Sequence, residues 1–66
     1  MILQWTNKNS GEHGYVAAMR YTKGYFENTF DITKAKKYRS SVDLNKDMSF
    51  LASIGEMENN EFVTIN

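Results

Sequence analysis

Few side chains of this chain could carry out chemistry, because it has one histidine, His13, and no cysteine. A metal site at His13 would need further carboxylate or thiolate ligands. The adjacent Glu12 would point to the opposite face of a strand. Catalysis with a serine nucleophile would need a third, orienting group that no spacing singles out. We therefore expect His13 to be a solvated loop residue, and we expect no catalytic, metal or cofactor site.

A pair of aspartates is the second candidate for chemistry. Asp43 and Asp47 are four residues apart and would share one face of a helix, where two carboxylates could do acid–base work. Lys46 lies three residues after Asp43 and would relieve the repulsion. We expect this face to be the solvated side of the helix. The four glycines match no phosphate-binding loop, so the sequence favours a protein that is not an enzyme.

A basic run, KAKKYR over residues 34–39, is the strongest candidate contact surface. Lysine and arginine contact phosphates, and an exposed aromatic ring can stack on a base. However, the pI of about 6.5 differs from that of a dedicated nucleic-acid binder. We expect a protein partner, including a second copy in a homodimer, with nucleic acid as the alternative. The residues expected to make this contact are Lys23, Lys34, Lys36, Lys37, Tyr38 and Arg39.

The length of 66 residues limits the chain to a single small domain, residues 1–66. Such a domain has a marginal core, and without cysteine no disulfide can reinforce it. Residues 1–39 carry seven basic and three acidic side chains, which gives a net charge of +4. Residues 40–66 carry one basic and five acidic side chains, which gives a net charge of −4. We expect these charges mainly to cancel within the fold; separated faces would instead favour head-to-tail association.

The first half of the chain predicts strands. Residues 1–6 predict a strand and residues 7–14, rich in Asn, Ser and Gly, a loop. Residues 15–30 predict a β-hairpin with a three-residue loop that ends at Gly24. A helix over residues 16–21 is the competing interpretation. Residues 31–39 form either a short helical turn capped by Asp31 or Thr33, or an extended segment.

The second half predicts a helix and a strand. Ser40 or Ser41 would cap a helix that ends at Gly55, and residues 62–65 would form a last strand after a polar turn. The fold class is therefore α+β: a small, mainly antiparallel sheet of three to four strands in β-β-β-α-β order, with one helix packed on one face. The expected core comprises Leu3, Trp5, Val16, Phe26, Phe30, Leu44, Met48, Leu51, Ile54, and Phe62 or Val63.

Part of the chain resembles a pattern in small uncharacterised proteins. The resemblance lies in the stretch DITKAKKYRS from residue 31, a helix that ends in LASIG, and a last strand FVTI. Phages and prophages of Gram-positive bacteria encode these α+β proteins. The resemblance spans about residues 14–65 and implies a phage or prophage origin, but no activity. No apolar run approaches the roughly 20 residues that span a membrane, and no signal peptide is visible. We expect a non-enzymatic accessory protein of the cytoplasm, without a cofactor or membrane contact.

Overall fold

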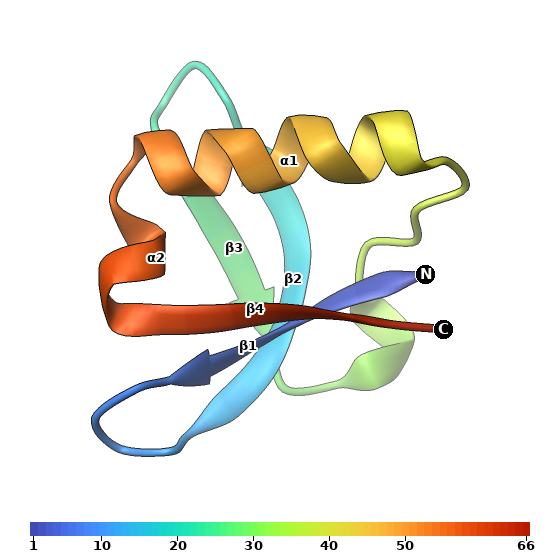
Figure 1. Cartoon of the computed structure of the whole chain (residues 1–66). Coiled ribbons are helices and arrows are strands. Elements are labelled where there is room, and N and C mark those ends of the chain that lie inside the picture. The colour runs from blue at the N-terminus through green and yellow to red at the C-terminus, as the bar shows by residue number, and fades with distance from the viewer.

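The computed structural model describes residues 1–66 and shows a four-stranded antiparallel sheet with one main helix (Figure 1). The strand order is β3-β2-β1-β4. This architecture confirms the predicted α+β fold. The elements are β1 (Ile2–Asn7), β2 (His13–Arg20), β3 (Tyr25–Thr29), the 3₁₀ turn η1 (Ile32–Lys34), α1 (Ser41–Ser53), α2 (Glu56–Asn59) and β4 (Asn60–Ile65).

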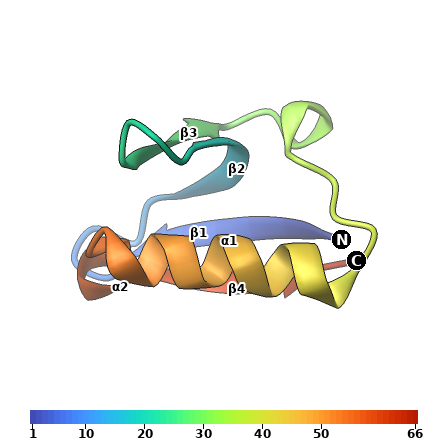
Figure 2. The same ribbon diagram turned by 90° about the horizontal axis from the view of Figure 1, so that it is seen from above.

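The sheet is strongly curved, and α1 covers its inner side. Phe26 lies on β3 and Phe62 on β4, the two opposite edge strands, yet their ring centroids are 5.8 Å apart. Figure 2 shows the β2–β3 hairpin set apart from the layer that contains β1, β4 and α1. The space between these two parts holds the hydrophobic core.

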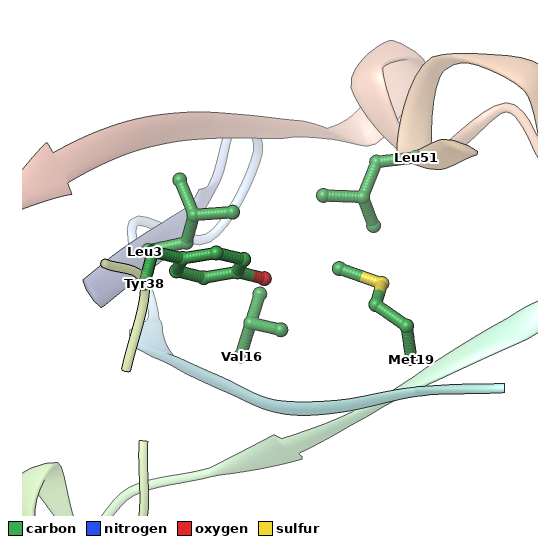
Figure 3. Packing of buried hydrophobic residues seen from close by; sticks show 5 residues of the cluster. All are labelled: Leu3, Val16, Met19, Tyr38 and Leu51. Atoms are coloured by element: carbon green, nitrogen blue, oxygen red, sulfur yellow. The ribbon is translucent and has the colours of Figure 1, made fainter. Parts of the chain in front are cut away.

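The centre of the core consists of five buried side chains: Leu3, Val16, Met19, Tyr38 and Leu51. Figure 3 shows the ring of Tyr38 beside Leu3 and Val16, while Leu51 points from α1 toward Met19. In a regular strand, Val16 and Met19 would lie on opposite faces of β2, because successive side chains alternate. A β-bulge between Val16 and Ala18 adds one residue and turns both inward, so the predicted facing is wrong beyond the bulge.

One of the expected core residues, Phe30, is exposed. β3 ends at Thr29, so Phe30 leaves the sheet; its ring lies 6.0 Å from that of Trp5, but the residue is 64% exposed. The prediction for Phe30 is therefore wrong. Phe62, rather than Val63, packs against the core. The helix residues of the expected core other than Leu51 are only partly buried: Leu44, Met48 and Ile54.

The predicted Ser40 cap and the glycines predicted to follow the helix and to close the hairpin are confirmed, although α1 ends at Ser53 and β2 begins at His13, within the predicted loop. The Ser40 hydroxyl accepts a hydrogen bond from the Asp43 amide at 3.2 Å, and Gly55, just after α1, has φ = 81°. Gly24, with φ = 77°, closes the hairpin, whose loop comprises the four residues 21–24 rather than three. Asp31 caps η1, which supports the helical alternative for that segment. The polar turn expected after Gly55 contains α2.

Replacing Leu51 by alanine should lower the free energy of unfolding by about 2–5 kcal/mol, because Leu51 is fully buried and its removal leaves a cavity. Val42 is 76% exposed on the same helix, so Val42→Ala is the matched control and should leave the melting temperature nearly unchanged. Chemical denaturation of both variants measures the difference. Equal stabilities would contradict the packing of α1 described above.

Candidate functional site

The linker between η1 and α1 runs between two strands that separate. β1 pairs with β2 only over Gln4–Thr6, because β2 turns away at its bulge. In the gap, the Lys36 amide donates to the Val16 carbonyl at 2.8 Å. On the other side, the Tyr38 amide donates to the Met1 carbonyl at 2.7 Å, and the Met1 nitrogen donates to the Tyr38 carbonyl at 3.1 Å. The basic run is therefore an inserted segment of the fold.

This insertion divides the predicted contact residues into inner and outer sets. The side chains of Ala35 and Tyr38 are buried, and Lys36 is half-buried. Tyr38 is 3% exposed, so the prediction of an exposed ring that could stack on a base is wrong; its backbone pairing with Met1 directs the ring into the core. The outer set, fully open to solvent, comprises Lys34, Lys37 and Arg39.

Asp47 lies beneath the linker and is 1% exposed, which corrects the prediction that it lies on the solvated side of the helix. The Tyr21 hydroxyl donates to Asp47 Oδ1, while the Tyr38 hydroxyl and Lys36 Nζ, the latter at 2.7 Å, donate to Oδ2. We call these four residues the Asp47 cluster. It joins α1 to the linker and to the hairpin loop. Its physical cause is that a buried carboxylate needs donors inside the protein.

The Asp47 cluster holds its members in fixed charge states. Burial tends to raise the pKa of Asp47, but hydrogen bonds from Lys36 and the two tyrosines outweigh burial and lower it. Burial also tends to lower the pKa of Lys36, yet its bonds to Asp47 and Tyr21 raise it. Burial and the bond to Asp47 raise the pKa of Tyr38 well above its usual value. At neutral pH the carboxylate is ionised and the phenol is neutral, which suits a structural role.

All four residues of the Asp47 cluster line a surface hollow of about 260 Å³. Its lining includes Lys36 and Lys37 from the linker, Asp43 and Lys46 from α1, and Tyr21. Tyr21 is 41% exposed, and Lys46 Nζ lies 4.7 Å from its ring centroid. The exposed aromatic ring beside the lysines of the hollow is thus that of Tyr21. Tyr21 is not among the contact residues predicted from the sequence. Strand alternation could not place it, because Tyr21 lies in the hairpin loop just after β2 ends at Arg20.

The opposite charges of the two halves meet at the hollow, where Asp43 and Asp47 lie with Lys36 and Lys37, whereas the acidic residues of α2 lie elsewhere. Figures 1 and 2 both show α2 and the linker at opposite ends of the molecule. Only one ion pair, Lys36–Asp47, joins the halves; the other, Arg20–Glu27, lies within the hairpin. Internal cancellation, the expected use of the charge split, is thus limited to a single pair. Lys23 lies in the hairpin loop and borders a different hollow from the linker lysines.

The edge formed by β4 has no hydrogen-bond partner on its outer side. β4 is the last strand of the sheet, and no hydrogen bond outside the strand ladder involves residues 61–65. Its residues Val63 and Ile65 alternate with the inward-facing Phe62 and so lie on the face of the sheet away from α1. On that face they pair with Gln4 and Ile2, so this part of the outer face carries no charged side chain.

His13 is exposed at the start of β2, and no three histidine or acidic side chains come together as a metal site. Neither helix has the length and apolar character needed to cross a membrane. Comparisons of the chain with protein-family models, curated proteins and solved structures find no match.

Replacing Asp47 by asparagine should lower the free energy of unfolding at neutral pH by about 2–4 kcal/mol, because Lys36 loses its charged partner inside the fold. The pKa of Asp47 is lower in the folded state than in the unfolded state. The ionised Asp47 therefore stabilises the fold at pH values above its pKa in the unfolded state, and this stabilisation is lost as the pH falls through its pKa in the folded state. The wild type and Asp47→Asn should therefore approach each other in stability as the pH falls below about 4, measured by urea denaturation.

Asp43→Asn provides the control, because Asp43 is an exposed aspartate one helical turn earlier. This variant should follow the wild type across the same pH range. A constant stability gap between wild type and Asp47→Asn at all pH values would contradict the ionised, hydrogen-bonded state of Asp47.

Proposed function

We propose that this chain is a non-enzymatic accessory protein that acts by associating with itself through the edge of β4. The observation that supports this proposal is the unpaired outer side of a six-residue edge strand. An exposed edge offers a row of backbone donors and acceptors to another chain, and natural proteins usually protect such edges with charges or proline. β4 contains no proline, and its one charged residue, Glu61, lies near its start.

The other edge of the sheet is better protected. β3 carries Glu27 in the middle of the strand, where Arg20 pairs with it at 2.5 Å. A charged side chain on an edge strand, such as Glu27 on β3, disfavours pairing with another chain. This difference selects β4 as the interface.

Two β4 strands can pair antiparallel about a twofold axis, which is the symmetry of most dimers. In a register centred on Val63, Glu61 faces Ile65 of the second copy, so the two carboxylates are kept apart. Val63 is 44% exposed and would gain apolar contact across the axis. A dimer of this kind also supports the small core of a 66-residue chain. The proposal includes a cytoplasmic location and a phage or prophage origin, supported by the lack of cysteine and by the sequence resemblance.

Val63→Lys should abolish dimerisation, because it places two like charges beside the axis and opposes edge pairing. Val42→Lys makes the same substitution at a 76% exposed valine on α1 and should leave the dimer intact. Sedimentation velocity from low to high micromolar protein measures both. A wild type that stays monomeric over this range, or equal behaviour of the two variants, would refute self-association through β4.

Nucleic-acid binding is the second candidate function, and the exposed outer set of the linker favours it. Lys34, Lys37 and Arg39 are open to solvent and form no ion pair. Lys36 is less available, because Asp47 holds its ammonium group. With Tyr38 buried, Tyr21 is the aromatic ring that would lie near a bound strand.

Labelled single- and double-stranded DNA should bind at low salt if this candidate is right, with affinity that falls steeply as salt increases. Lys37→Ala combined with Arg39→Ala should weaken binding about tenfold or more through lost phosphate contacts. Lys8→Ala, in the loop after β1, is the control for a change in net charge. Absence of any anisotropy change at tens of micromolar protein would eliminate this function.

A further inference from the structure

We propose that the hollow bordered by Tyr21, Lys37 and Lys46 binds a phosphoryl group. Its volume of about 260 Å³ can admit a small oxyanion, and its walls come from three separate parts of the chain: the linker, α1 and the hairpin loop. The proposal is independent of the β4 edge. It gives the linker lysines a defined ligand chemistry.

The hollow carries two lysines without an anionic partner. Neither Lys37 nor Lys46 has a carboxylate within ion-pair distance, although the chain as a whole has no net charge. Asp47 also lines the hollow, but its two oxygens already accept hydrogen bonds from three donors. Asp43 is the one remaining carboxylate in the lining. The local field at the mouth of the hollow is therefore positive, which favours an anion.

The hydrogen-bonding capacity of the lysines also suits a group with several acceptor oxygens. Lys46 Nζ lies over the ring of Tyr21, a contact that leaves all three of its N–H donors unused. Lys36 Nζ donates to Asp47 and, at 3.3 Å, to Tyr21, which leaves one donor. Lys37 makes no side-chain hydrogen bond, so its three donors are available. A phosphoryl group has enough lone pairs to accept from all three lysines.

A free phosphate or phosphate monoester and the backbone of a nucleic acid present the same phosphoryl chemistry. The test therefore titrates the ¹⁵N-labelled protein separately with inorganic phosphate and with a short single-stranded DNA, at constant ionic strength set by sodium chloride. Saturable shifts of the Tyr21, Lys37 and Lys46 resonances with inorganic phosphate are the expected result. Additional shifts at Lys34 and Arg39 with DNA alone would identify the nucleic-acid backbone as the source; their absence would identify a free phosphate group.

Variants test which charges form the site. Lys46→Ala should weaken phosphate binding about tenfold, whereas Lys34→Ala, an exposed lysine outside the hollow, should have no effect. Asp43→Asn should strengthen binding severalfold, because it removes the one carboxylate left at the mouth. Because the three side chains are exposed, matching melting temperatures would show that each variant is folded. Phosphate shifts that never saturate, or equal weakening by Lys34→Ala and Lys46→Ala, would overturn the proposal.

Discussion

The structure depends on how one buried carboxylate obtains its hydrogen bonds. Asp47 is 1% exposed, and an ionised carboxylate in that position is stable only when donors surround it. The donors are Tyr21 from the hairpin loop and Lys36 and Tyr38 from the linker. One side chain of α1 therefore fixes the helix against two other parts of the chain. Without the Asp47 cluster, α1 would be held mainly by the apolar contacts of Leu51 and its neighbours.

The donors reach Asp47 because of an irregularity in β2. The bulge between Val16 and Ala18 turns the strand away from β1 and opens a gap. The linker fills this gap and pairs with Val16 on one side and Met1 on the other. A regular β2 would continue beside β1 and leave the linker on the surface. The bulge thus accounts both for the inward-facing Met19 and for the burial of Tyr38.

The two surfaces proposed for function contain groups that have no partner within the fold: lysines without a carboxylate, and backbone groups of β4 without a hydrogen bond. Asp47 neutralises Lys36, but Lys37 and Lys46 remain without an anionic partner around the hollow. β1 satisfies one side of β4, but no element covers the other. Glu56 and Glu58 belong to α2, which lies at the opposite end of the molecule from the linker (Figure 1). These features are separate, so association through β4 and anion binding at the hollow do not depend on each other.

The sequence by itself determined the elements whose signals are local. Ser40 and Gly55 bound the helix, and Gly24 closes the hairpin, because capping and positive φ depend on neighbouring residues alone. The basic run also identified Lys37 as a surface residue, and Lys37 is exposed.

Only the tertiary structure decided that Asp47 and Tyr38 are buried and that the exposed ring beside the linker lysines is Tyr21. The contacts responsible join Tyr21 to Asp47, 26 residues apart, and Met1 to Tyr38, 37 residues apart. A bulge shifts the facing of every later residue in its strand, and periodicity cannot show where that shift occurs.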